Sequence, residues 1–117
     1  FILEGFAVGM DIGVDVQEMA ECPDYREIAE NFYTAEEAED VKNEGPDLFF
    51  QYWAAKEAYV KALGIGLGRG MDFFSVRNGK IAEKDKKDQD WFLYPVRIKG
   101  YAAYVAAHKK GDKSNEL

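Results

Sequence analysis

The stretch Trp53-Ala-Ala-Lys-Glu-Ala-Tyr-Val-Lys61 decides the fold, because it places one carboxylate and two ammonium groups in an otherwise apolar helical segment. The apolar residues recur at the spacing of one helical face and are Phe49, Trp53, Val60 and Leu63. Lys56 falls within the arc of this face, while Glu57 and Lys61 lie along its edge. We therefore predict a long core helix whose edge carries an acid beside a base.

Chain-breaking residues mark both ends of this central helix. Gly45-Pro46-Asp47 interrupts the chain and favours a helix start, and Gly64 stands where a C-terminal glycine ends a helix. The central helix is therefore expected from about Asp47 to Leu63.

Two shorter helices are predicted before the central one. Pro23 opens the first, which runs to about Phe32. Thr34 and Glu37 form a capping box that starts the second, which runs to about Asn43 and is strongly acidic. We expect this acidic helix to be mostly solvated.

Alternating side chains predict strands near the start of the chain. Residues 2–9 and 12–17 fit two strands joined by a tight turn at Met10-Asp11. Alternation in the second strand separates one face, with Ile12, Val14 and Val16, from the other, with Gly13, Asp15 and Gln17. This predicted hairpin presents Asp15.

Short strands and turns are expected after the central helix. A glycine-rich loop over residues 64–70 leads to a strand at 73–77, and Asn78-Gly79 signals a type I' hairpin. The glycine spacing fits neither a dinucleotide fingerprint nor a P-loop. The hairpin leads to residues 80–82, which are followed by a predicted mobile loop at 83–90. The last two strands are predicted at 91–99 and 101–108.

These elements predict an α+β fold, in which an antiparallel sheet of three or more strands packs against the long central helix. With 117 residues, of which 47% are hydrophobic, the chain can bury the core of one domain. We expect a single domain over residues 1–117 with a frayed tail from about Lys109. Cys22 is the only cysteine, which excludes an internal disulfide framework.

The net charge of −7 argues against nucleic acid as the main ligand, because a protein that binds the phosphate backbone needs a basic stripe. Most of the acidic excess lies in residues 18–47, whereas residues 56–80 are mainly basic. The basic stretch would attract an anionic ligand, although ordinary surface lysines and arginines give the same pattern. The sequence shows no signal peptide and no apolar run of membrane-spanning length, which predicts a cytoplasmic protein.

Two motifs in this order resemble the 4'-phosphopantetheinyl transferases. They are Gly13-Val-Asp-Val-Gln17 and Trp53-x-x-Lys-Glu-x-x-x-Lys61, followed by Gly64-Ile-Gly-Leu67. The closer resemblance is to the C-terminal half of the larger, surfactin-synthetase-activating type, and it covers residues 4–107. It implies the α+β half-domain of that superfamily. It also implies an Mg²⁺-dependent enzyme that transfers 4'-phosphopantetheine from coenzyme A to a serine of an acyl or peptidyl carrier protein.

The resemblance implies a role for each candidate residue. Asp15 and Glu57 match the metal-binding carboxylates of the family, and Mg²⁺ is commonly held by one or two carboxylates together with substrate phosphates and water. Lys56 and Lys61 match lysines that bind phosphates of coenzyme A near the transferred group, and Lys61 is therefore counted with Glu57 as catalytic. Glu57 also matches a residue implicated as the base that takes the proton of the attacking serine. Both roles of Glu57 stay open.

Gln17 departs from the family pattern, because most of the larger enzymes have a glutamate at this position. We expect Gln17 to bind the metal through water. The structural alternatives are a solvent-facing strand carboxylate for Asp15 and an i, i+4 surface ion pair for Glu57 and Lys61, which contributes about 0.2–0.5 kcal/mol. Trp53 is expected to pack in the core.

The sequence leaves two other hypotheses open. One is a non-catalytic interaction module that keeps the fold and binds metal or nucleotide, and the other is an unrelated α+β binding domain. In the larger enzymes two similar halves share the active site, and Phe1 stands where the second half would begin. We therefore expect the chain to pair with an N-terminal half-domain, or to self-associate, through an exposed apolar patch. His108 and Cys22 lack sequence partners for a zinc or nucleophilic site and are expected to be incidental.

Overall fold

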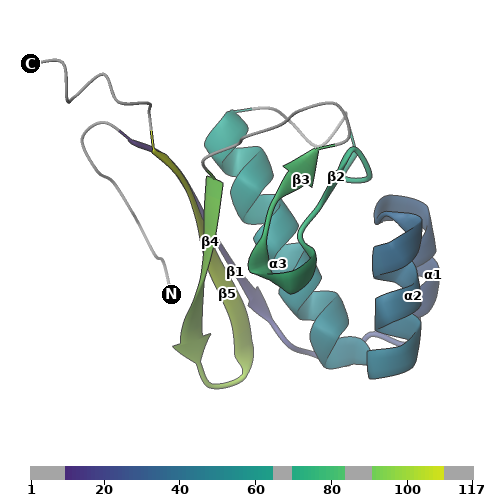
Figure 1. Cartoon of the computed structure of the whole chain (residues 1–117). Helices are drawn as coiled ribbons and strands as arrows, with labels where there is room; N and C mark the ends of the chain where they lie inside the picture. The colour runs from purple at the N-terminus through teal and green to yellow at the C-terminus, as the bar shows by residue number, and fades with distance from the viewer. Residues whose placement is uncertain (1–9, 65–69, 84–90, 110–117) are drawn as a thin grey trace, which may run out of the picture.

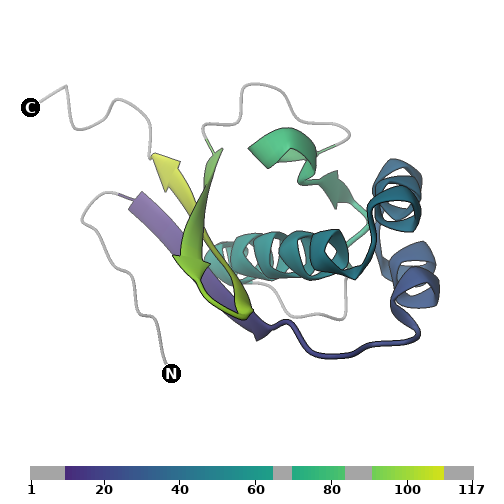
Figure 2. The ribbon, with the colours of Figure 1, turned by 90° about the horizontal axis from the view of Figure 1, so that it is seen from below.

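The computed structural model describes residues 10–64, 70–83 and 91–109. The elements in chain order are β1 (Met10–Glu18), α1 (Tyr25–Phe32), α2 (Ala35–Glu44), α3 (Pro46–Leu63), β2 (Phe74–Ser75), the 3₁₀ turn η2 (Arg77–Gly79), β3 (Ala82–Glu83), β4 (Trp91–Ile98) and β5 (Tyr101–Lys109). Figure 1 shows α3 between the sheet on one side and the pair α1 and α2 on the other, and Figure 2 shows the same layers from below. The predicted α+β class is confirmed.

The main sheet is antiparallel, with three strands in the order β1-β5-β4. Strand β1 pairs with β5 along its whole length, from Met10 opposite Lys109 to Glu18 opposite Tyr101. Strands β4 and β5 form a hairpin, and Gly100 at its turn has a φ of 81°, which favours glycine. The two predicted C-terminal strands are therefore confirmed, and within the described residues the two edges of the sheet are β1 and β4.

The predicted turn at Met10-Asp11 is wrong, because both residues belong to β1. The partner of β1 is β5, from the opposite end of the described chain. Alternation identifies the two faces of a strand, but it does not show where the strand begins or which strand pairs with it. The strand predicted at residues 2–9 lies outside the described residues.

Gly13 lets β1 approach α3 closely. A Cβ atom at this position would lie 2.0 Å from the backbone oxygen of Ala58 and 2.5 Å from the backbone nitrogen of Ala62. Any other residue would therefore push the strand and the helix apart. The strand face that carries Gly13, Asp15 and Gln17 is consequently the face turned toward α3.

The three helices begin and end close to the predicted residues. The capping box of α2 is present, since Glu37 N donates to Thr34 Oγ1 at 3.2 Å and Thr34 N donates to Glu37 Oε1 at 3.0 Å. Helix α3 ends at Gly64, whose φ of 74° is left-handed. The expectation that α2 is mostly solvated fails at Glu37, which is fully buried.

The core lies on both sides of α3. Phe49 and Val60 are buried, and Trp53 is partly buried with its ring close to Phe32, Tyr33 and Phe49. The expectation that Trp53 packs in the core is confirmed. Apart from Asp15, the buried helix-facing side chains of the sheet are small or aliphatic and include Leu93, Ala102 and Ala106.

The segment after α3 contains less strand than predicted. Strand β2 has two residues and pairs with β3 at Phe74 opposite Glu83 and Ser75 opposite Ala82. Asn78 and Gly79 have positive φ angles of 60° and 71°, but they lie in a six-residue connection instead of a two-residue type I' turn. Residues 65–69 of the predicted glycine-rich loop and residues 84–90 of the predicted mobile loop lie outside the described residues.

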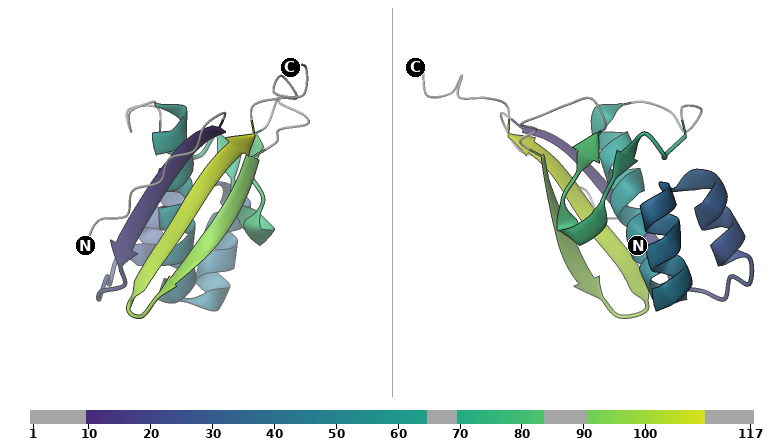
Figure 3. Two further views of the ribbon diagram at one scale, coloured as in Figure 1. Left: turned by 90° about the vertical axis from the view of Figure 1, so that its left-hand side faces the viewer. Right: turned by 45° about the vertical axis from the view of Figure 1, so that its right-hand side comes forward.

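All helices of the described chain lie on one face of the main sheet (Figure 3, left). Leu93 points toward the core, so its strand neighbours Phe92 and Tyr94 point to the opposite face, where both are exposed and their rings stack 6.3 Å apart. Tyr101 pairs with Ile98 on this same face and is also exposed. The sheet face turned away from the described helices therefore carries three exposed aromatic side chains.

Candidate functional site

The structure brings Asp15, Gln17, Glu57 and Lys61 together where β1 packs on α3. Asp15 is only 4% exposed. Lys61 Nζ donates to Asp15 Oδ1 at 2.7 Å, and Gln17 Nε2 donates to Asp15 Oδ2 at 2.7 Å. Residues far apart in the sequence thus form one cluster, centred on a buried carboxylate.

Glu57 completes the cluster from α3, one helical turn before Lys61. Burial raises the pKa of Glu57, and the negative charge of Asp15 raises it further, while the ammonium of Lys61 lowers it. The net pKa is above the ordinary value. Asp15 and Glu57 therefore repel each other, and additional positive charge at this place would stabilise both carboxylates.

The donor set of this cluster fits a hard divalent cation only if other ligands contribute. In the part of the chain that the structure describes, no group of three or more His, Cys, Asp or Glu residues could hold a metal ion. Asp15 and Glu57 supply two carboxylates, and Gln17 supplies an amide. Mg²⁺ commonly accepts one or two carboxylates with phosphate and water oxygens, so the residues present fit Mg²⁺ bound together with a phosphate ligand.

Lys56 does not belong to this cluster. It is fully buried, and its Nζ donates to the carbonyl oxygens of Met71 at 2.7 Å and Phe74 at 2.6 Å and pairs with Glu37 Oε1 at 2.7 Å. These partners use the three donors of the ammonium group. The predicted contact of Lys56 with a coenzyme A phosphate is thereby corrected, because no side of the buried ammonium is left for a phosphate.

Sequence reasoning missed the partner of Lys56. Glu37 Oε1 accepts hydrogen bonds from Thr34 N and from Lys56, and Oε2 accepts one from Val76 N at 2.6 Å. Burial lowers the pKa of Lys56, and the charge of Glu37 opposes this shift. The position of Lys56 inside the apolar arc was the available signal, since a buried lysine needs a buried acid.

A second ion pair joins the same elements nearer the surface. Arg77 donates to Asp40 through Nε at 2.7 Å and through Nη2 at 3.1 Å, and Tyr52 donates its hydroxyl to Asp40 at 2.8 Å. Burial acts to raise the pKa of Asp40, but the hydrogen bonds from Arg77 and Tyr52 outweigh it, and the pKa is lowered. Helix α2 thus fastens residues 74–77 to α3 through Glu37 and Asp40.

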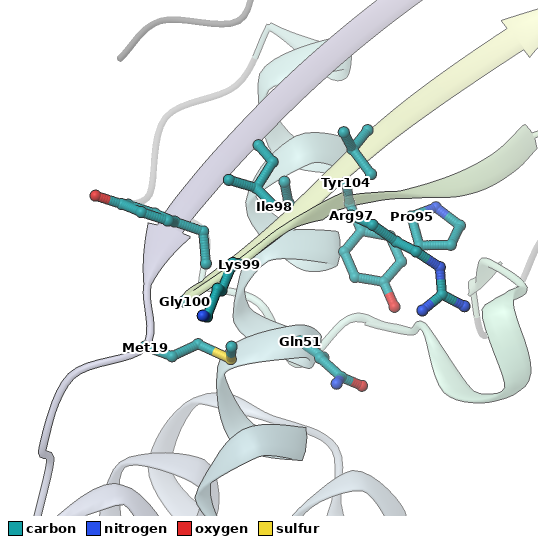
Figure 4. A pocket seen from close by; sticks show the side chains of 11 residues that line it. Met19, Gln51, Pro95, Arg97, Ile98, Lys99, Gly100 and Tyr104 are labelled. Atoms are coloured by element: carbon teal, nitrogen blue, oxygen red, sulfur yellow. The ribbon is translucent and has the colours of Figure 1, made fainter.

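Within the described residues, two hollows are lined by side chains of α3, and one of them borders the cluster. The first, of about 520 Å³, lies at the β4–β5 turn; Figure 4 shows the side chains of Gln51, Arg97 and Tyr104 around it, and it contains none of the predicted site residues. The second is apolar, has a volume of about 210 Å³ and is lined by Gln17, Ile28, Phe49, Phe50 and Trp53. Because Gln17 belongs to both the second hollow and the cluster, an apolar ligand group could lie beside the carboxylates.

The two residues expected to be incidental, His108 and Cys22, pack against neighbouring side chains. The ring of His108 stacks on Trp91 with centroids 4.7 Å apart. Cys22 is a partly buried free thiol that packs against the core. A search of residues 10–64, 70–83 and 91–109 finds no helix that is long and apolar enough to cross a membrane.

The sequence matches a known protein family. The model of the 4'-phosphopantetheinyl transferase superfamily matches residues 11–107, which is most of the chain. This chain is a member of that superfamily. The match includes Asp15, Gln17, Glu57 and Lys61.

Curated relatives share the name of the family. A 4'-phosphopantetheinyl transferase of Bacillus subtilis, ffp, is 40% identical over 70 residues, which cover 56% of this chain and 30% of the relative. The transferase Sfp of Bacillus subtilis strain 168 is 37% identical over 70 residues, with the same coverage. This chain therefore spans about 30% of the length of these relatives.

Solved structures show the same fold. A holo-(acyl-carrier-protein) synthase from Bacillus anthracis, solved with coenzyme A (3',5'-ADP), matches with a TM-score of 0.65 and 23% identity, covering 86% of this chain and 96% of that one. The holo-[acyl-carrier-protein] synthase of Thermotoga maritima matches with a TM-score of 0.62 and 25% identity, covering 90% of this chain and 71% of that one. The small synthases and this chain therefore share one α+β architecture.

Proposed function

We propose that this chain is the C-terminal half-domain of an Sfp-type 4'-phosphopantetheinyl transferase. The reaction is transfer of 4'-phosphopantetheine from coenzyme A to a serine of an acyl or peptidyl carrier protein. The observation that carries the proposal is the meeting of Asp15, Glu57 and Lys61 at one place, although a long stretch of sequence separates β1 from α3. Membership of the superfamily supports the choice of reaction.

The cluster supplies the charges that phosphoryl transfer needs. Asp15 and Glu57 would hold Mg²⁺, with Gln17 contacting it through water, and the ion when bound supplies positive charge to the diphosphate of coenzyme A. Lys61, whose side chain is about half exposed, can place its ammonium group against a phosphate oxygen. These residues therefore orient the diphosphate and spread its negative charge.

Glu57 is also suited to accept a proton. The hydroxyl oxygen of the serine attacks the β-phosphorus, the bond from this phosphorus to the bridging oxygen breaks, and adenosine 3',5'-bisphosphate leaves. The proton of the serine passes to Glu57, directly or through water. Burial and the charge of Asp15 raise the pKa of Glu57, and a bound divalent ion would oppose this shift, so Glu57 would act as an ionised carboxylate beside the ion when it accepts the proton.

A second domain would complete the site. The sheet face turned away from the described helices carries Phe92, Tyr94 and Tyr101, and exposed aromatic side chains on one face favour an interface. The cluster lies on the opposite face of the sheet, toward α3, so a domain on the aromatic face would have to extend around β1, an edge strand among the described residues, to reach Asp15. We propose that this domain is the N-terminal half or a second copy of the chain.

One observation favours a different function. Gln17 stands where a third carboxylate would strengthen the metal site, and the described residues contain no larger cluster of metal ligands. A non-catalytic module that keeps the fold would have the same features. Transfer activity separates the two hypotheses.

Mass spectrometry of an apo carrier protein tests the proposed function. The chain, alone and together with an N-terminal half-domain, is incubated with coenzyme A and Mg²⁺, and addition of phosphopantetheine to the carrier is measured. We expect transfer that falls more than about 100-fold in Asp15→Ala and in Glu57→Ala, because each removes a metal-holding carboxylate. Glu18→Ala, an exposed acid on the same strand, is the matched control.

Two further measurements make the result decisive. Titration calorimetry should show loss of Mg²⁺-dependent coenzyme A binding in both variants, with the fold unchanged by circular dichroism. Light scattering should show that the chain alone self-associates, and that the active species contains two domains. Transfer by a clean monomer would contradict the shared site, and transfer unaffected by both substitutions would contradict the assignment of the cluster.

A further inference from the structure

Both carboxylate oxygens of Asp15 already have a donor from within the chain. Lys61 Nζ lies 2.7 Å from Oδ1, and Gln17 Nε2 lies 2.7 Å from Oδ2. The Asp15 side chain is 3% exposed, whereas the Lys61 side chain is 53% exposed. A cation that approaches Asp15 from solvent therefore meets the Lys61 ammonium first.

The pair is built so that one partner can leave. Asp15 is fixed on a strand and packed against α3, but Lys61 reaches it with a long, exposed side chain that can turn into solvent. Because the Lys61 side chain is exposed, its ammonium is hydrated when it leaves, and a divalent ion that takes its place keeps the buried Asp15 carboxylate paired. Gln17 is shorter and lies on the same strand as Asp15, so its amide stays near the carboxylate.

We propose that Lys61 is an exchangeable internal cation that occupies Asp15 until a divalent ion replaces it. This inference rests on the proposed function, since it concerns the same metal and phosphate site. A divalent ion and an ammonium group on the same oxygen repel each other, so binding of the ion releases Lys61 from Oδ1. The released ammonium then lies beside the site, where it can donate a hydrogen bond to a phosphate oxygen of the bound diphosphate.

The charges of the cluster explain why exchange would couple the two ligands. Asp15, Glu57 and Lys61 together carry a net charge of −1. A bound divalent ion makes the net charge of the cluster positive. The positive excess is removed when a diphosphate binds between the ion and Lys61. Each ligand therefore strengthens binding of the other, and linkage requires the effect to be reciprocal.

The test measures Mg²⁺ binding to the full chain, without carrier protein or turnover. Isothermal titration with MgCl₂ compares the wild type with Lys61→Met, which keeps an unbranched side chain of similar length and removes the charge. We expect Mg²⁺ to bind Lys61→Met more tightly than the wild type, by up to about fivefold, the size of the effect of an exposed ion pair. Lys42→Met, an exposed lysine on α2, should leave Mg²⁺ binding unchanged.

A second titration measures the coupling, with inorganic pyrophosphate as the probe because it carries the diphosphate of coenzyme A alone. Pyrophosphate should increase Mg²⁺ affinity in the wild type by a larger factor than in Lys61→Met, and Lys61→Arg should recover part of the difference. Chelation of Mg²⁺ by pyrophosphate is measured separately and subtracted.

The outcomes separate this inference from the proposed function. Mg²⁺ binding that is equal or weaker in Lys61→Met overturns the exchange and leaves the metal site intact. Absence of Mg²⁺ binding in both proteins, with and without pyrophosphate, overturns the metal site on which the proposed function depends. Circular dichroism of each variant confirms that the fold is kept before either conclusion is drawn.

Discussion

Lys56 and Lys61 stand on the same helix, and each forms a 2.7 Å ion pair with a carboxylate, yet the two pairs belong to different parts of the molecule. The Lys56–Glu37 pair is closed to solvent on both sides. In the Lys61–Asp15 pair only the acid is buried, while the lysine side chain is 53% exposed. The first pair joins α2, α3 and the segment before η2, and the second lies at the candidate site.

The comparison shows that burial, more than pairing distance, decides what a charged pair can do. Removing a partner from the closed pair leaves a charge that water cannot reach, which costs several kcal/mol. The Lys61–Asp15 pair is open to solvent on the lysine side. In this open pair the lysine can leave, and water or an ion can take its place. A motif with two lysines therefore contains one structural lysine and one that can exchange partners.

The largest expected effect on stability comes from a substitution that breaks the closed Lys56–Glu37 pair. Lys56→Met should lower the free energy of unfolding by about 3–5 kcal/mol, because Glu37 remains buried without its cation. Urea denaturation followed by circular dichroism measures the loss. Lys61→Met is the matched control on the same helix and should lower stability by less than Lys56→Met, because water can reach the place that the exposed ammonium leaves.

A double variant sharpens this prediction. Glu37→Gln with Lys56→Met removes both charges, so it should be less destabilised than Lys56→Met alone, while the amide of Gln can still accept from a backbone donor. Equal losses in Lys56→Met and Lys61→Met would contradict the distinction between the closed and the open pair.

The second prediction breaks the open pair and spares the closed one. Gly13→Ala should lower the free energy of unfolding by about 1–3 kcal/mol, because the added Cβ overlaps the α3 backbone at Ala58 and moves β1 away from α3. Asp15 would then lie farther from Glu57 and Lys61, so Mg²⁺ affinity measured by calorimetry should fall more than stability predicts. Val14→Ala, the next residue on β1, should leave Mg²⁺ affinity near the wild-type value.

The smallest expected effect changes the charge of the open cluster. Gln17→Glu should tighten Mg²⁺ binding several-fold by adding a carboxylate oxygen beside Asp15, and it should lower stability without Mg²⁺ by less than about 1 kcal/mol through repulsion. Calorimetry and thermal denaturation with and without Mg²⁺ measure both effects. Gln51→Glu on α3 is the control, and weaker Mg²⁺ binding in Gln17→Glu would mean that the amide is needed as a donor to Asp15.

Local signals predicted most of the helices because their causes are local. Breaking residues and the capping box located the ends of α2 and α3, and the last two strands were predicted on the two sides of Gly100, where β4 and β5 lie. The turn predicted at Met10-Asp11 is wrong because both residues lie in β1, and the pairing of β1 with β5 is a long-range contact that no local signal predicted. Sequence patterns specify the faces of a strand, but its neighbour is selected by packing of the whole sheet.

The candidate site divides in the same way. The sequence by itself determined the residue types, the helix edge that carries Glu57 and Lys61, and the strand face that carries Asp15 and Gln17, because helical and strand periodicity depend only on the local backbone. The tertiary structure alone decided that Gly13 lets these two elements meet and that Glu37 takes Lys56 into the core. The physical reason is that burial and the distances between distant segments depend on how the entire chain packs, so lysines five positions apart on one helix have different surroundings.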